Sequence, residues 1–181
     1  VYFDFVTNKA VSKFIAPEDL IVPYEASDMS SAERITHALN MSLNEIKKQQ
    51  VTGFYADVEI NETDYNDDDS DVKTRIVELQ GIESSYKEDR SRTIYEIHTV
   101  LDIEGFEDVD ANGQPTGLKL PYIITIDEGS EAVLAIRRNY IEGDPLKNKI
   151  NYFVQYKFLP GLGFYGLGLS HMIGGLSKAS M

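Results

Sequence analysis

The sequence predicts an α+β fold, with a mainly antiparallel β-sheet and a few short helices in a single domain. Most periodic segments alternate apolar and polar residues, which is typical of half-buried strands. Helical spacing is confined to brief stretches, and 181 residues are enough to bury one ordinary core. The β-sheet is therefore expected to be the main element of the fold.

The first half of the chain begins with short strands and turns. We expect strands at residues 11–15 and 20–22, with a turn at 16–19 between them. Residues 34–41 alternate and predict a longer, half-buried strand. One face of this strand carries Ile35, His37, Leu39 and Met41.

Residues 42–45 have the spacing of a capping box. In this motif the Ser42 hydroxyl and the Glu45 carboxylate each accept a hydrogen bond from a free backbone amide at the helix start. The motif predicts a short helix that runs to about Gln50 and is ended by Gly53.

The second half of the chain has the clearer strand pattern. Residues 120–126 and 133–141 predict a hairpin joined by a turn at 127–130, and residues 152–158 predict one more strand. Residues 93–104 predict a strand with one apolar face, which carries Tyr95, Ile97, Leu101 and Ile103.

An acidic segment lies between the two halves. Eight of the fifteen residues at positions 57–71 are acidic and none is basic, so the segment repels itself and is expected to loop out. A short helix is expected at residues 72–81, directly after it. The run Asp67-Asp68-Asp69-Ser70-Asp71 is predicted to be a solvated loop, with weak binding of divalent ions as the alternative.

Charge and composition narrow the function classes. Thirty acidic residues against seventeen basic ones give a net charge of −13, which argues against tight binding of DNA phosphates. The absence of cysteine excludes disulfides and thiolate metal sites, and it is compatible with a reducing cytoplasm. No apolar run approaches the roughly 20 residues of a membrane span, so no membrane partner is expected.

Residues 108–113 match the first half of a calcium-binding loop, in which acidic residues at alternate positions converge on a hard cation. The twelfth position of such a loop should be a bidentate glutamate, but it is Lys119. A polar hairpin or loop is therefore the preferred interpretation, and a calcium site is the alternative.

Three polar residues suggest a possible nuclease-like site. His98, Asp102 and Glu104 alternate along one predicted strand, but a solvent-facing polar stripe explains that spacing without chemistry. His37 is expected to take part in cross-strand pairing and His171 to hold a structural position at a helix start. We predict no catalytic residue, no cofactor and no metal ligand, and the chain is not expected to be an enzyme.

Four arginines are expected to form ion pairs with acidic residues of this domain or of a neighbouring subunit. They are Arg90, Arg92, Arg137 and Arg138.

Residues 158–175 form a glycine-rich, aromatic segment with almost no charge. It holds six of the thirteen glycines and reads FLPGLGFYGLGLSHMIGG. Such a segment must pack against something, because its exposed apolar side chains favour association. From Leu169 onward the apolar spacing becomes helical, so we predict a hinge at 158–168 that leads into a helix.

This segment is also the predicted subunit interface, with packing inside the chain as the alternative. The residues expected to form the interface or hinge are Gly161, Gly163, Phe164, Tyr165, Gly166, Leu167, Gly168, Leu169, His171 and Met172.

Five ordered segments resemble portal proteins of tailed bacteriophages and prophages, of the podovirus-like kind. They are PEDLIVPY at 17–24, TGFYADVE at 52–59, LDIEGFED at 101–108, PTGLKLPYIITID at 115–127 and QYKFLPGLGFYGLGLSHMIGGLSK at 155–178. The resemblance covers nearly the whole chain. Portal chains are much longer, and the central channel helices and the tail-facing clip have no counterpart here.

The resemblance implies a fragment with two parts. Residues 1–157 would be a wing-like α+β domain, and residues 158–181 a hinge that leads into a truncated helix. The opening VYFDFV and the closing LSKASM also suggest that both ends are cut.

The implied function is that of a structural subunit in a dodecameric ring at the capsid vertex of a virion assembled in the bacterial cytoplasm. The ring would serve genome packaging, ejection and head-to-tail joining. Its implied partners are other copies of itself, the terminase, capsid and tail-adaptor proteins, and DNA that passes without sequence-specific binding. A carboxylate-dependent metal-binding protein or hydrolase is the alternative function.

Overall fold

The computed structural model describes residues 2–4, 9–60, 79, 91–110, 112–161 and 163–179. Two short strands come first, β1 (Tyr2–Asp4) and β2 (Lys9–Val11), and a 3₁₀ turn (Pro17–Asp19) follows. The remaining elements are β3 (Leu20–Ile21), β4 (Ile35–Ser42), α1 (Leu43–Val51), β5 (Ser91–Leu101), β6 (Leu120–Asp127), β7 (Val133–Arg138) and α3 (Leu169–Ala179). The predicted α+β class, dominated by antiparallel sheet, is confirmed.

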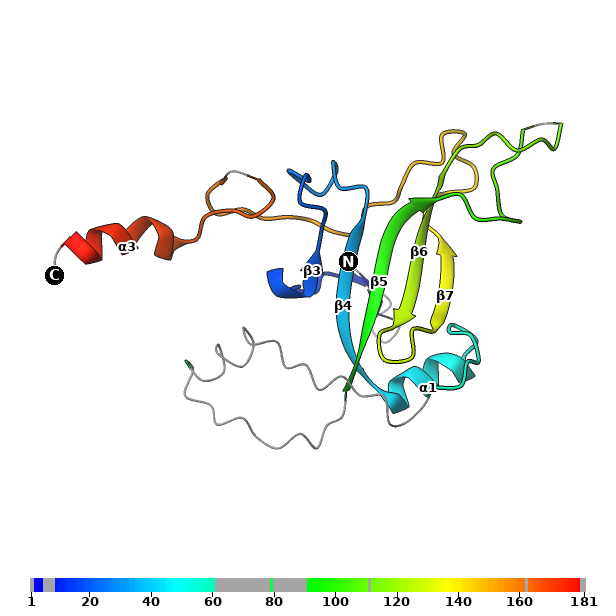
Figure 1. Cartoon of the computed structure of the whole chain (residues 1–181), viewed down its shortest axis with the longest axis horizontal. Coiled ribbons are helices and arrows are strands. Elements are labelled where there is room, and N and C mark those ends of the chain that lie inside the picture. Colours follow the sequence, from blue (N-terminus) through cyan, green and yellow to red (C-terminus); the bar gives the residue numbers. More distant parts are fainter. Residues whose placement is uncertain are drawn as a thin grey trace. The chain divides into compact units, whose positions relative to one another are not determined.

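The main sheet has five strands in the order β3-β4-β5-β6-β7 (Figure 1). The β6–β7 hairpin is antiparallel, with Ile124 opposite Ile136 and a bulge between Thr125 and Ile126. Residues 128–132 join its strands, so the hairpin is present as predicted, although its turn was expected at 127–130. In the described part of the chain, β3 and β7 are the two outer strands of this sheet.

The chain divides into two compact units. One comprises residues 36–98 and 122–138, and the other comprises residues 1–35, 99–121 and 139–181. Each unit has its own cluster of buried apolar side chains.

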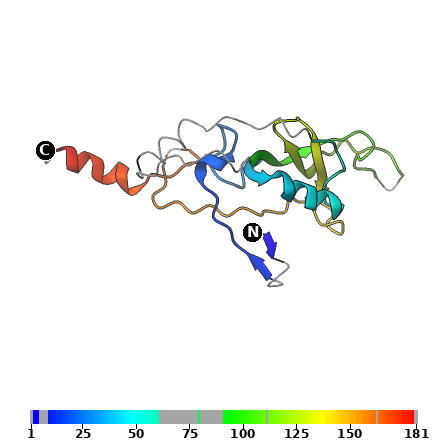
Figure 2. The same ribbon diagram turned by 90° about the horizontal axis from the view of Figure 1, so that it is seen from below.

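In the unit of residues 36–98 and 122–138, helix α1 packs on one face of the sheet. Fully buried Ile46 of α1 joins Ile94 of β5 and Leu134 of β7, and Leu39 and Met41 of β4 border this cluster. Leu39 and Met41, two of the four residues expected on one face of β4, therefore border the same cluster, whereas Ile35 lies in the cluster of the other unit. Figure 2, in which the molecule is seen from below, also shows α1 beside these strands.

The start of α1 agrees with the sequence prediction in detail. Ser42 accepts a hydrogen bond from the Glu45 amide, and the Glu45 side chain accepts one from the Ser42 amide. Gly53 lies just past the last turn with a φ of 74°, a conformation that glycine adopts without steric cost.

In the other unit, four of the buried core residues lie between positions 20 and 35 and the fifth is Phe164. The four are Leu20, Ala26, Ala32 and Ile35. Strands β1 and β2 form a separate antiparallel ribbon, visible in Figure 2. The core of this unit therefore depends on a residue from the glycine-rich segment.

Several boundaries differ from the sequence predictions. The strand expected at 11–15 ends at Val11, and β7 ends at Arg138 rather than at position 141. Residues 152–158 form no hydrogen-bonded strand. The helix expected from Leu169 is present as α3, whereas most of the acidic segment and of the helix expected at 72–81 lie outside the described residues.

Among the helices of the described part of the chain, none has the length and apolar character that crossing a membrane requires.

Candidate interaction surface

Exposed apolar side chains are concentrated between positions 154 and 173. Nine large ones are exposed among the described residues of this stretch, a density that marks interaction surfaces. They are Val154, Tyr156, Phe158, Leu159, Tyr165, Leu167, Leu169, Met172 and Ile173.

The first part of this surface, residues 153–158, alternates like a strand. Val154, Tyr156 and Phe158 are 66%, 92% and 75% exposed. Phe153 instead packs against the core of its unit, and Gln155 and Lys157 point to partners within the same unit. The apolar row is thus turned outward while the intervening residues hold the segment in place.

Residues 154–158 are not part of a sheet in the described structure. No backbone hydrogen bond joins residues 154–158 to another described residue. Extended backbone with free N–H and C=O groups is a template for pairing with another strand.

The glycine-rich segment that follows is a compact loop. An isolated bridge joins Leu159 and Leu167, and the Leu167 amide donates to the Leu159 carbonyl at 2.8 Å. A Cβ on Gly166 would lie 2.9 Å from that same carbonyl oxygen, and one on Gly161 would lie 3.0 Å from the Tyr165 carbonyl. Glycine is therefore required where the two sides of the loop approach.

Phe164 fixes this loop to its own unit. Its side chain is only 7% exposed and lies in the cluster that includes Leu20 and Ile35. Gln155 Nε2 donates to the Phe164 carbonyl at 2.7 Å, and the Tyr165 hydroxyl donates to the Leu20 carbonyl at 3.3 Å. The expectation that Phe164 remains available to a partner is wrong, because this residue packs within the chain.

Lys157 adds two further contacts to this loop. Its Nζ donates to the Ser27 carbonyl at 3.0 Å and to the Gly163 carbonyl at 3.2 Å. Gly163 has a φ of 101°, in the region that favours glycine. Lys157 therefore links the loop at Gly163 to the backbone at Ser27.

The remaining predicted interface residues lie in or next to α3. Leu169, Met172 and Ile173 are about half exposed on this helix, and Gly168 precedes it in a half-buried position. His171 lies in the first turn of α3. The apolar spacing that predicts the helix therefore also leaves apolar side chains accessible on it.

Arg92 is one of the four arginines expected in ion pairs, and its partner is Asp127. Arg92 Nε lies 2.9 Å from Asp127 Oδ1, and Nη2 lies 2.6 Å from Oδ2, with both side chains buried. Ser130 donates to Asp127 Oδ2 from its backbone and its hydroxyl. Burial raises the pKa of Asp127, but the bonds from Arg92 and Ser130 outweigh it, so the pKa lies below its usual value.

The other arginines are placed differently. Arg137 lies over the Phe54 ring, with its guanidinium carbon 4.4 Å from the centroid. Arg138 also has an interaction partner, whereas Arg90 lies outside the described residues.

His98 does not belong to a solvent-facing stripe. It is buried on β5, and its Nε2 lies 3.1 Å from Glu96 Oε1. The hydrogen bond from His98 is the main reason why the pKa of Glu96 lies below its usual value. Asp102 and Glu104 follow the end of β5 and are exposed, so the three expected nuclease-like residues do not form one face.

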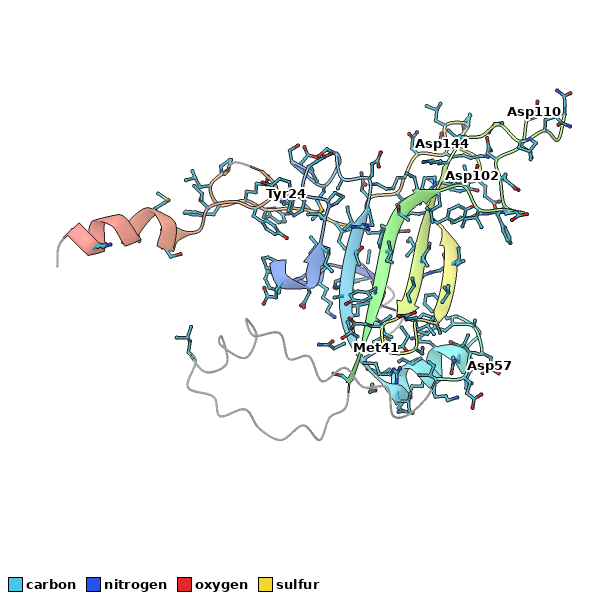
Figure 3. The ribbon with its side chains drawn as sticks, viewed as in Figure 1. Tyr24, Met41, Asp57, Asp102, Asp110 and Asp144 are labelled. Carbon is cyan, nitrogen blue, oxygen red and sulfur yellow. The ribbon has the colours of Figure 1, made fainter. Side chains whose placement is uncertain are left out.

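The half-match to a calcium loop is a polar hairpin, as preferred from the sequence. Val109 and Pro115 form a bridge, and Asp110 Oδ1 accepts the amides of Asn112 and Gln114 at 2.8 and 2.9 Å. Those bonds, the Gln114 amide first, hold the pKa of Asp110 below its usual value. Figure 3 labels Asp110 near the tip of this loop.

The first acid of that motif is also occupied. The Thr116 hydroxyl donates to Asp108 Oδ2 at 2.6 Å, and Lys147 donates to Oδ1. Within the described ranges, no group of three or more histidines or acidic residues is arranged to hold a metal ion.

Sequence reasoning missed the outward row of Val154, Tyr156 and Phe158. Its signal was available, because apolar residues at every second position of 154–158 indicate a strand face. The sequence does not show that this face points outward. That orientation depends on the partners of Lys157 and Gln155, which lie far away in the chain or across the loop.

Comparison of this chain with protein-family models, with curated proteins and with solved structures gives no match.

Proposed function

We propose that this chain is part of a portal protein, a structural subunit of a homo-oligomeric ring at the capsid vertex of a tailed phage or prophage. The ring would form the conduit for genome packaging and ejection and the junction between head and tail. The observation that carries the proposal is the run of nine exposed apolar side chains between positions 154 and 173. Such a surface is typical of a protein that works in an assembly.

The sequence resemblance supplies the identity of that assembly. Three of the five portal-like segments, at 17–24, 101–108 and 155–178, lie in the same unit as the exposed surface. Different surfaces on neighbouring copies make heterologous contacts, and such contacts form a ring when the rotation closes. A dodecamer is the ring that the resemblance implies.

The role of the ring would be passive. The sequence has no phosphate-binding glycine-lysine motif, so ATP hydrolysis is assigned to a separate terminase. A net charge of −13 is compatible with DNA that slides past without being held. Capsid and tail-adaptor proteins are the further partners in this proposal.

Electron microscopy of the purified protein tests this proposal. The expected result is closed rings with a central opening. Open fibres, or particles without a central opening, would contradict it.

A matched pair of variants links the ring to the surface. Phe158→Asp places a charge on the apolar surface and should abolish rings. Phe14→Asp changes another largely exposed phenylalanine, at 85% against 75% for Phe158, which lies outside this surface, and it should leave the rings intact. Equal effects of the two variants on ring formation would show that the rings do not depend on this surface.

A further inference from the structure

Asn112 and Gly113 lie in the polar hairpin that follows β5, next to Asp110 in Figure 3. This is the only place in the sequence where glycine follows asparagine. Both residues are exposed, and a Cβ built on Gly113 would meet nothing within 4 Å. Water therefore reaches this part of the chain, and Gly113 has no side chain that shields its own backbone nitrogen.

An asparagine side chain can react with the backbone nitrogen of the next residue. The nitrogen attacks Cγ, the bond from Cγ to Nδ2 breaks, and ammonia leaves. Water then opens the resulting succinimide ring and yields either aspartate or isoaspartate. Glycine hinders this attack least, because it lacks a Cβ and has the widest choice of backbone angles.

We propose that Asn112 is a site of this spontaneous deamidation and that Asp110 controls its rate. The reactants are the Asn112 side chain, the Gly113 backbone nitrogen and water, so the reaction needs no enzyme and no cofactor. The inference does not depend on the proposed ring.

Hydrogen bonds to Asp110 hold the turn that contains both reacting groups. The Asp110 carboxylate accepts the amides of Asn112 and Gln114 at 2.8 and 2.9 Å. The Asp110 carbonyl accepts the Gly113 amide at 3.0 Å, and the Asp110 amide donates to the Gln114 carbonyl at 2.8 Å. In the closed turn the Gly113 nitrogen is therefore already engaged.

These bonds explain how Asp110 would slow the reaction. The Gly113 nitrogen must lose its proton in order to attack Cγ, and in the closed turn it donates that proton to the Asp110 carbonyl. The attack therefore requires the turn to open. The Asp110 carboxylate resists opening, because it holds the amides on both sides of Gly113. Deamidation should then occur during transient local opening of the hairpin.

The reaction would change the hairpin that contains it. Either product replaces the side-chain amide of Asn112 by a carboxylate, and Asn112 Nδ2 lies 3.4 Å from Asp110 Oδ2. Two negative charges at such a distance repel each other. Isoaspartate also lengthens the main chain by one carbon atom. The bridge between Val109 and Pro115, which closes the hairpin, should therefore be weakened.

Asn148 provides a comparison within the same chain. It is also exposed, and Asp144 Oδ2 accepts both its backbone amide and its Nδ2 at 3.0 Å. The next residue is Lys149, whose side chain hinders the attack on Cγ. The two asparagines thus share exposure and an aspartate partner but differ in the residue that follows.

Peptide mass spectrometry of the protein incubated in mildly alkaline buffer tests the proposal. Asn112 should convert several times faster than Asn148, and fragmentation by electron transfer should show isoaspartate as well as aspartate. The conversion should also become faster as the pH rises, since the Gly113 nitrogen must lose its proton. Equal rates at the two asparagines, or no conversion at Asn112, would overturn the inference.

A matched pair of variants tests the role of Asp110. Asp110→Ala removes the carboxylate bonds that hold the turn and should speed the conversion of Asn112 several-fold. Asp144→Ala removes the equivalent bonds to Asn148, which should still convert more slowly than Asn112 because Lys149 follows it. Urea denaturation checks that the rest of each variant remains folded. An unchanged or slower conversion of Asn112 in Asp110→Ala would show that Asp110 does not control the rate.

Discussion

At the residue scale, Arg92 and Asp127 form a fully buried ion pair in the described structure. Both side chains are essentially inaccessible to water, so each charge depends on the other and on the bonds from Ser130. Ion pairs of this kind contribute little compared with an apolar pair, but removing one partner leaves a buried charge.

We therefore expect Asp127→Asn to destabilise the fold by about 3–5 kcal/mol, because Arg92 keeps its charge without a compensating carboxylate. The free energy of unfolding from urea denaturation at pH 7 measures this loss. Glu33→Gln is the control, since Glu33 is exposed, and it should change stability by less than about 0.5 kcal/mol. Equal losses in the free energy of unfolding for the two variants would mean that the ion pair does not stabilise the fold.

Acid should weaken the same interaction. The pKa of Asp127 is lowered in the folded state, so its stabilisation is complete above the unfolded-state pKa of about 3.9 and is lost as the pH falls through the folded value. The stability difference between the natural protein and Asp127→Asn should therefore be constant from pH 7 to about 5 and should shrink below about 4. Urea titrations across this range measure it, and a difference that grows in acid would contradict the assignment.

At the element scale, the loop of residues 159–167 depends on glycine where its two sides meet. Gly166→Ala would place a Cβ 2.9 Å from the backbone oxygen of Leu159, which has no flexible group to move aside. We expect a loss of about 1–3 kcal/mol in the free energy of unfolding, because the loop must open. Phe164 lies in this loop and in the core of its unit, so its side chain should also become more exposed.

Gly143→Ala is the matched control for this change. A Cβ at Gly143 would meet nothing within 4 Å, and its φ lies outside the glycine region. Its effect should be neutral or slightly stabilising by the lower chain entropy of alanine. Thermal unfolding monitored by circular dichroism compares the two variants. Equal melting temperatures would show that the close approach of Gly166 to the Leu159 carbonyl does not affect stability.

Elements governed by local contacts could be predicted from the sequence. The capping box of Ser42 and Glu45, the β6–β7 hairpin and the polar turn around Asp110 each depend on residues close together in the chain. Their geometry is set by hydrogen bonds that span only a few positions, so the spacing of residue types is sufficient information.

Elements governed by distant contacts could not be predicted in the same way. His98 was expected on an exposed stripe, but the face of β5 that holds it is buried by the fold. Phe164 was expected at a partner surface, but it fills a core whose other members lie between positions 20 and 35. Residues 152–158 have a strand pattern but form no strand in the described chain. A strand forms only beside a partner edge, and no pattern within a segment identifies that edge.

At the scale of the whole molecule, the chain divides into two compact units with separate cores. One of them holds the outward apolar row and the glycine-rich loop. In the proposed ring this surface would lie between neighbouring copies. The exposed apolar surface then has a structural reason, because assembly removes it from water.

The central claim is that this chain is a subunit of a closed ring of identical copies. Its native mass, measured by sedimentation equilibrium over a wide range of concentrations, tests that claim most directly. One discrete species of about a dozen copies is expected, since a ring that closes by rotation has a fixed number of subunits. A species that stays monomeric at all concentrations, or a mass that grows without limit, would contradict it.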